Sequence, residues 1–383
     1  MARSSAEQGG AAVRLTRDQA RRLRLDSLLL ADPGEARRRP ASVADVVGWF
    51  GAMQAQDYAS GLWSLGLRLP GMTRADVQAA LERREALRTW PMRGTVHLVP
   101  TRDAHWMLEL MGQRALAGAA RRREFLGLDD RVADHAVELL ATALSGGRRL
   151  SRAQCLEVLE RGGVSGAGQR GYHLLWYASQ QAVTAIAPHV DGEQTFVLLD
   201  EWAPDPVRLD RETALRTIAE RFVRSHGPAT RHDLAGWTGL PLRDVDRGVS
   251  LLAEDVVRVD VEGTPMLATA ASLDRLPRLA TGVPLRVPPG FDEYLLGYKD
   301  RSLMLTPEQM QAVVPGGNGV FRATVVRAGR VVATWRRAPK ARTTCVDVLP
   351  LVPLGARDRG RVAEAFEPYQ SFLSTPVEVR WAA

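Results

Sequence analysis

One order of elements occurs twice in the middle of the chain: three helices followed by a β-hairpin. Apolar residues at helical spacing and caps such as Ser151 predict the first set, with helices over 131–145, 151–159 and 169–180 and strands over 182–187 and 194–199. The second set has helices over 212–223, 230–237 and 241–252 and strands over 256–261 and 265–269. This order is typical of a winged helix, and a generic helical bundle with hairpins is the alternative.

The two ends of the chain differ from this repeat. Near the start, the pattern predicts helices over 16–30, 42–53 and 73–83, a hairpin of 87–90 with 95–99, and an enlarged connection over 54–70. From residue 285 the chain is rich in strands, which we expect at 294–298, 320–327, 330–336, 343–349 and 377–381, with one helix over 356–371.

We therefore predict an α+β fold of three tandem winged-helix modules followed by a β-rich, barrel-like C-terminal domain. The expected boundaries are a disordered lead-in (1–14), a first winged helix with the enlarged insertion (15–128), a second (129–206), a third (207–284) and the C-terminal domain (285–383).

The charge balance indicates a polyanionic partner only weakly. The 383 residues carry a formal charge of +7, which suits a phosphate backbone, but the excess of arginine over lysine is also typical of a GC-rich genome. Cys155 and Cys345 have no neighbours at metal-ligand spacing, and the glycines of 162–168 lack a following Lys-Ser/Thr, so we expect no metal and no cofactor. No apolar run reaches the about 20 residues that span a bilayer, and we expect a cytoplasmic protein.

The most informative string is Met53-Gln54-Ala55-Gln56-Asp57-Tyr58, at the end of an apolar helix. Gln54 and Gln56 are too close in sequence to share a helical face, but on an extended backbone both side chains point the same way and converge on one point. Spacing alone favours the other interpretation, in which these are solvated polar residues at a helix end.

Longer strings carry a resemblance to a known family. The segments 53–58, 62–68 and 89–99, together with 291–301, 318–321 and 329–335, resemble the AlkZ-type winged-helix DNA glycosylases over nearly the whole chain from about Leu15. The resemblance implies three winged helices and a β-rich domain around a DNA channel, with Gln54 and Gln56 as the catalytic pair. A second branch of the family has Gln-x-Asp. Gln56 at the third position assigns this chain to the branch that resembles antibiotic self-resistance enzymes, and Asp57 lies one residue too late to replace that aspartate.

Amide chemistry limits the substrate. A glutamine can orient a water but cannot act as a strong general base, and the string contains no evident acid, so the leaving base must need little help. A purine alkylated at N7 or N3 is cationic and fits this requirement. We predict a monofunctional, metal-independent glycosylase that acts on double-stranded DNA with bulky alkylpurines and on interstrand crosslinks, as a monomer without an obligatory protein partner.

Five further residues are predicted to contact DNA: Arg93 at a hairpin tip, Lys299, Arg301, Arg336 and Arg337. We expect His97 to be structural, and Asp292 and Glu293 to be ion-paired at a strand end. Two other functions remain open at this point. One is a non-catalytic winged-helix transcriptional regulator, and the other is a hydrolase that uses Asp57 or Asp292 on a substrate other than nucleic acid.

Overall fold

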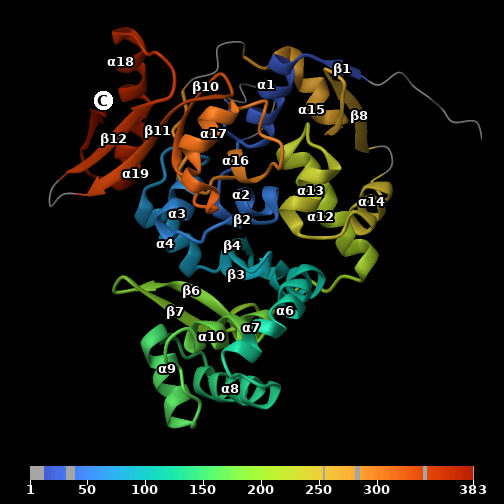
Figure 1. The fold of residues 1–383 in the computed structure, drawn as a ribbon, viewed down its shortest axis with the longest axis vertical. Helices are drawn as coiled ribbons and strands as arrows, with labels where there is room; N and C mark the ends of the chain where they lie inside the picture. Colours follow the sequence, from blue (N-terminus) through green and yellow to red (C-terminus); the bar gives the residue numbers. More distant parts are fainter. Residues whose placement is uncertain (1–12, 32–38, 253–254, 281–284, 340–342, 383) are drawn as a thin grey trace, which may run out of the picture.

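The computed structural model describes residues 13–31, 39–252, 255–280, 285–339 and 343–382. Most of the predicted lead-in lies outside these ranges. Figure 1 shows helices α8–α10 and the β6–β7 hairpin at one end of the molecule and the C-terminal sheet toward the other end.

The N-terminal part contains the predicted helices, with two corrections. Helix α2 ends at Gly51, whose φ of +83° suits glycine, and Met53 is the first residue of a strand instead of the end of a helix. The predicted connection over 54–70 contains a helix, α3. The elements are β1 (Val13–Leu15), α1 (Arg17–Ser27), α2 (Val43–Phe50), β2 (Met53–Gln54), α3 (Tyr58–Gly66), α4 (Arg74–Glu82), β3 (Ala86–Met92) and β4 (Thr95–Pro100).

The middle of the chain follows the predicted order of helices and hairpins. Side-chain caps start its helices, as in the capping box of Ser151 and Gln154. After α5 (Ala104–Met107), α6 (Gln113–Gly118) and α7 (Ala120–Phe125), the elements are α8 (Asp130–Leu144), β5 (Leu150–Ser151), α9 (Arg152–Arg161), α10 (Arg170–Gln180), β6 (Thr184–Val190), β7 (Glu193–Leu198) and α11 (Leu199–Trp202). The second set is α12 (Arg211–His226), α13 (Arg231–Thr238), α14 (Leu242–Ser250), β8 (Val256–Val261), β9 (Thr264–Thr269) and α15 (Ala270–Arg275).

Pairing between the hairpins joins parts of the chain that are far apart in sequence. Strands β3 and β6 pair at Arg88 and Ile186, so the first two hairpins form one six-stranded sheet in the order β2-β4-β3-β6-β7-β5. Strand β1 pairs in parallel with β8, in the sheet β1-β8-β9. The predicted disordered lead-in is therefore wrong for Val13 and Arg14, which are held by ladder hydrogen bonds.

The C-terminal part is β-rich but forms no barrel. Its strands β10 (Ala323–Arg327), β11 (Arg330–Pro339), β12 (Thr344–Pro350) and β13 (Val377–Trp381) form an open sheet in chain order, in which β10 and β13 are the edges within the described residues. The predicted barrel is therefore wrong. The predicted helix over 356–371 is divided into α18 (Ala356–Glu364) and α19 (Glu367–Leu373), and α17 (Pro307–Val313) was not predicted.

The predicted strand over 294–298 is also wrong, because a short helix, α16 (Glu293–Leu296), occupies this position. Asp292 caps it by accepting a hydrogen bond from the backbone N–H of Tyr294 at 2.9 Å. An apolar run this short has no periodicity that separates a strand from a buried helix.

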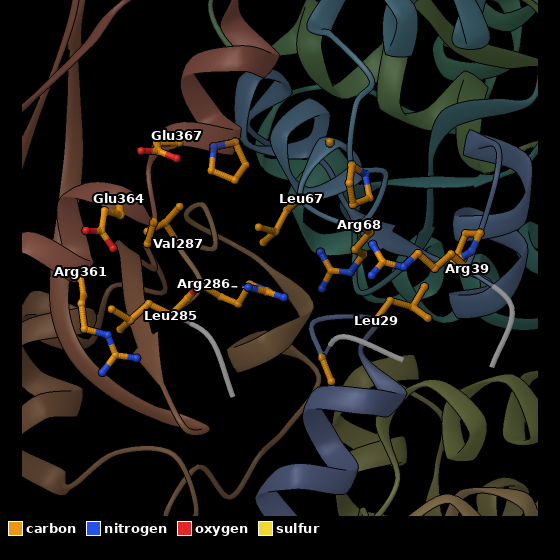
Figure 2. Close-up of a pocket in the computed structure, with 16 residues that line it drawn as sticks. Leu29, Arg39, Leu67, Arg68, Leu285, Arg286, Val287, Arg361, Glu364 and Glu367 are labelled. Carbon is orange, nitrogen blue, oxygen red and sulfur yellow. Dashed lines mark hydrogen bonds between the residues drawn. The ribbon is translucent and has the colours of Figure 1, made fainter. Parts of the chain in front are cut away.

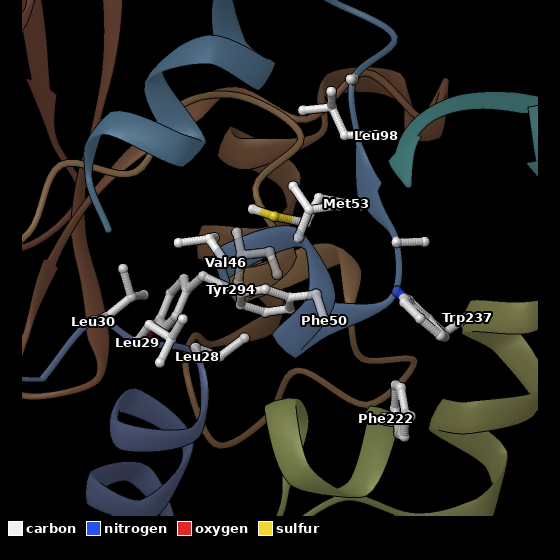
Figure 3. Close-up of a cluster of buried hydrophobic side chains, with 14 of the residues drawn as sticks. Leu28, Leu29, Leu30, Val46, Phe50, Met53, Leu98, Phe222, Trp237 and Tyr294 are labelled. Atoms are coloured by element: carbon white, nitrogen blue, oxygen red, sulfur yellow. The ribbon is translucent and has the colours of Figure 1, made fainter. Parts of the chain in front are cut away.

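A single buried cluster packs α16 against the N-terminal elements. Figure 3 shows Phe50 and Met53 beside Tyr294, with Trp237 and Phe222 approaching from α13 and α12. Met53 is 1% exposed, so its burial holds the β2 backbone in place at the residue before Gln54.

Candidate active site

Strand β2 ends at Gln54 and the backbone bends at Gln56 and Asp57, so the extended backbone expected for both glutamines covers Gln54 but not Gln56. Gln54 pairs with His97 on β4, and the N–H of Ala55 donates to the carbonyl of Val96 at 2.9 Å. Ala55 is 2% exposed and lies against Gly61 of α3, where an added Cβ would be 3.0 Å from the Ala55 Cβ. The small residue between the two glutamines therefore faces the core.

The side-chain amides of Gln54 and Gln56 differ in their hydrogen bonds. The Oε1 atom of Gln56 accepts a hydrogen bond from the backbone N–H of Val96 at 3.0 Å, which fixes the orientation of this exposed amide and leaves its NH2 group without a partner among the described residues. The Gln54 side chain is 9% exposed and forms no hydrogen bond with any described residue. Both amides thus retain groups that can hold a water molecule.

A buried carboxylate fixes the backbone of Gln54. The Oε1 atom of Glu293 accepts a hydrogen bond from the Gln54 N–H at 2.8 Å, and its Oε2 atom accepts one from the Trp237 indole at 2.9 Å and lies 3.3 Å from Nε2 of His226. Burial raises the pKa of Glu293, but the hydrogen bond and charge of His226 together with the Gln54 N–H outweigh it and lower the pKa to about 2. Glu293 is therefore an ionised positioning residue at the end of a helix, not at a strand end.

His97 and Arg93 lie next to this segment. The Nδ1 atom of His97 is 2.8 Å from the Thr95 carbonyl and donates to it, which leaves Nε2 to accept from the Arg93 guanidinium at 3.2 Å. Burial and then the Arg93 charge lower the pKa of His97 to about 3, so the ring is neutral at pH 7. Cross-strand partners share a face of the sheet, so Gln54, His97 and the guanidinium of Arg93 lie together.

We expect this neutral histidine to make stability depend on pH. Because folding lowers the pKa of His97 from 6.5 to about 3, its contribution is present above pH 6.5 and is lost as the pH falls toward 3. At pH 5 the free energy of unfolding is lower by about 2 kcal/mol because of this residue, at about 1.36 kcal/mol for each pH unit below 6.5. Denaturant unfolding at pH 7.5 and pH 5 should show the His97→Asn protein losing about 2 kcal/mol less than the wild type. An equal loss in the two proteins would show that His97 is not held neutral.

The carboxylates of the hydrolase hypothesis are occupied. Asp292 is 4% exposed and forms a two-pronged ion pair with Arg68, at 2.8 and 3.0 Å, and also accepts a hydrogen bond from Ser64 at 2.6 Å. Asp57 caps α3 through the backbone N–H of Ser60 at 2.8 Å. Asp292 thus binds the end of α3, and the adjacent Glu293 binds β2 at Gln54.

The other residues predicted to bind DNA lie after α16 and on β11. The guanidinium of Arg301 donates to the Leu295 carbonyl at 2.7 Å, and Lys299 is exposed beside α13, where its backbone N–H donates to Asp233. Arg336 and Arg337 are consecutive on β11 and therefore lie on opposite faces of the sheet. Arg336 pairs with Asp347 at 3.0 Å. Arg93 lies next to Gln54 through its contact with His97.

A cavity of about 430 Å³ lies at the other end of α3. Figure 2 shows Arg68, Leu67 and Leu29 facing Arg286 and Val287 across it. Since Gly66 and Leu67 end α3 and Asp57 begins it, this cavity is separated from the glutamines by the length of the helix. We therefore do not assign it to the site. No helix among the described residues is long and apolar enough to cross a membrane.

Comparisons with known proteins identify the family of this chain. The model of the AlkZ-like DNA glycosylase family matches residues 47–372, which contain Gln54, Gln56 and Glu293. A relative from Streptomyces sahachiroi, named an interstrand DNA cross-link repair glycosylase, is 27% identical over 319 residues, covering 79% of this chain and 83% of the relative. The solved structure of Streptomyces sahachiroi DNA glycosylase AlkZ has a TM-score of 0.80 at 23% identity, and the match covers 97% of this chain and 100% of that one.

These matches define the class of the protein, which is an enzyme that removes bases from DNA, a DNA glycosylase. The chain belongs to the AlkZ-like DNA glycosylase family. It shares the mixed α+β fold of the solved relative. The alternative of a non-catalytic winged-helix regulator is not favoured by these matches.

Proposed function

We propose that this glycosylase hydrolyses the N-glycosidic bond of purines that carry bulky alkyl groups at N7 or N3, with Gln54 and Gln56 holding the attacking water. The observation that carries the proposal is a pair of nearby amides with unused hydrogen-bonding groups, in which Glu293 binds the backbone of Gln54 and the Val96 N–H binds the side chain of Gln56. Such fixed groups lower the barrier by positioning the water where the bond breaks.

The charge state of the site favours a cationic base as the leaving group. Glu293 is ionised and its oxygens are already bound, while Asp57 caps a helix, so neither is a ready proton donor. An alkylated purine already carries a positive charge and leaves with the bonding electrons as a neutral base. Water then adds to the sugar C1′ and loses its proton to solvent, so the product is an abasic strand that remains intact.

The exposed position of Gln56 supports a wide range of substrates. A bulky adduct need not enter a closed pocket to bring its sugar to an amide on the surface. The relative named for interstrand cross-link repair extends the proposal to crosslinks, in which the attached second strand is a very large substituent. Self-resistance to a DNA-alkylating antibiotic is the biological role that fits this substrate class.

We extend the proposal to the architecture and the partner. Residues 15–128, 129–206 and 207–284 are three winged-helix modules, each with helices and one of the hairpins β3–β4, β6–β7 and β8–β9, and residues 285–383 form the C-terminal domain. The enzyme acts on double-stranded DNA as a monomer, without a cofactor. The net charge of +7 supports binding to the phosphate backbone.

The test is release of the damaged base. A duplex with a single 7-alkylguanine is incubated with excess protein, and the free base and alkali-sensitive sites are measured. We expect free alkylguanine and a strand that breaks only after alkali treatment. A transcriptional regulator would instead leave the lesion intact and protect a preferred sequence, and this result would contradict the proposal.

A further inference from the structure

A basic pocket of about 630 Å³ lies beside the turn of the β3–β4 hairpin. It is bordered by α6, α7 and α10, by the first residue of α9 and by the end of α13. Its volume is that of a site for a small organic ligand or a nucleotide. Its lining residues include no carboxylate, and those that determine its chemistry are Arg93, Arg114, Arg122, Arg152, Tyr172 and Trp176.

The arginines of the basic pocket lack acidic partners. No ion pair joins Arg114, Arg122 or Arg152 to a carboxylate within the described ranges of the chain. By contrast, Arg123, adjacent to Arg122, pairs with Asp130 at 2.9 Å. Guanidinium groups that converge without counter-charges favour an anion, and phosphate is the anion whose geometry suits arginine.

His173 lies in the wall of the basic pocket. It is 7% exposed, and its Nε2 atom has no hydrogen-bond partner among the described residues. Burial, followed by the charges of Arg123 and Arg122, lowers the pKa of His173, so the ring is neutral. The His173 ring therefore forms part of the pocket wall and adds no charge to the arginines.

Aromatic rings complete the basic pocket. Tyr172 is 42% exposed, and the Arg152 guanidinium lies 5.8 Å from the centre of its ring. The rings of His173 and Trp176 lie 5.1 Å apart on the same helix. Phosphate-binding groups beside exposed rings are the combination that binds a nucleotide.

Arg93 connects the basic pocket to the glutamines. It lines the pocket and also binds His97, which pairs with Gln54. We propose that the basic pocket binds a nucleotide of the DNA strand adjacent to the excised base, with the arginines on its phosphates and Tyr172 on its base. This inference rests on the proposed function, because it names the part of the DNA that the glycosylase holds beside its site.

The test compares two double variants that remove equal charge. Arg114→Gln/Arg152→Gln should weaken binding to a fluorescent lesion-containing duplex about 10-fold and reduce the slope of log Kd against log salt by about one to two units. The control is Arg161→Gln/Arg216→Gln, exposed arginines on α9 and α12 that do not line the pocket. Tyr172→Ala should weaken binding about 5-fold without changing the slope, because stacking involves no counterions.

Three outcomes would overturn the inference. The first is an unchanged slope of log Kd against log salt in the pocket variant. The second is an equal loss of DNA affinity in the control variant, which would show that the effect comes from net charge alone. The third is binding of dAMP to the wild type, measured by calorimetry, that is lost in the pocket variant although this variant binds DNA as tightly as the wild type. This result would show that the ligand of the pocket is a free nucleotide. If the wild type releases no alkylated base but the pocket variant still binds DNA less tightly, the proposed function fails and the pocket assignment stands.

Discussion

Gln54→Ala and Gln56→Ala should each slow the release of an alkylated purine by about 100-fold to 1,000-fold, the usual cost of removing one group that acts on the transition state. DNA affinity should change by only a few-fold, because the side chains act on the water and not on the phosphate backbone. The Gln54 N–H keeps its bond to Glu293 in the alanine variant, so the segment stays in place. Single-turnover rates with saturating protein measure the effect.

Asp57→Asn is the matched control, because it changes the adjacent side chain but keeps an acceptor for the helix cap at Ser60. Its rate should stay close to that of the wild type. Full single-turnover rates in both glutamine variants would show that the chemistry occurs elsewhere in the molecule.

Asp292→Ala should lower the free energy of unfolding by about 3 to 5 kcal/mol, because it leaves the buried Arg68 charge without its partner. The Arg68 and Asp292 side chains are 0% and 2% exposed, and Arg68 also donates to the carbonyls of Leu28 and Ser64. The pair therefore ties the C-terminal part to α3 and to the end of α1. Denaturant unfolding monitored by tryptophan fluorescence measures the loss.

The comparison for this variant is Asp244→Ala, which breaks the ion pair with Arg211, whose side chain is 59% exposed. That change should cost at most about 1 kcal/mol, since water and salt screen an exposed pair. Equal losses in the two variants would contradict the structural role of the buried pair.

The sequence predicts local structure well where the signal is local. Helical spacing and caps such as Ser151 identify the helices, and the turn at Arg93 and Gly94 separates β3 from β4, as expected. Pairing of β3 with β6, and of β1 with β8, depends on contacts between distant segments that no local pattern encodes. The barrel prediction was wrong for the same reason, because the number of strands alone does not determine whether a sheet closes into a barrel.

The candidate site shows a similar division. The extended backbone predicted for both glutamines is found at Gln54 but not at Gln56, which lies in a bend. The support from Glu293 requires the fold, because 239 positions separate it from Gln54. One signal was present: Asp292 and Glu293 stand directly before the apolar run Tyr294-Leu295-Leu296. Two acidic residues beside an apolar run indicate carboxylates that are buried and have partners. We expected them instead to be ion-paired at the end of a strand.

The account depends on a cationic leaving group, so the most direct test compares charged and neutral bases. Single-turnover base release is measured on matched duplexes with one 7-methylguanine, one hypoxanthine or one uracil. We predict rapid release of 7-methylguanine and no release of the two neutral bases above the rate without protein. Release of hypoxanthine or uracil as fast as 7-methylguanine would contradict the account, since it would require a proton donor that the glutamine site lacks.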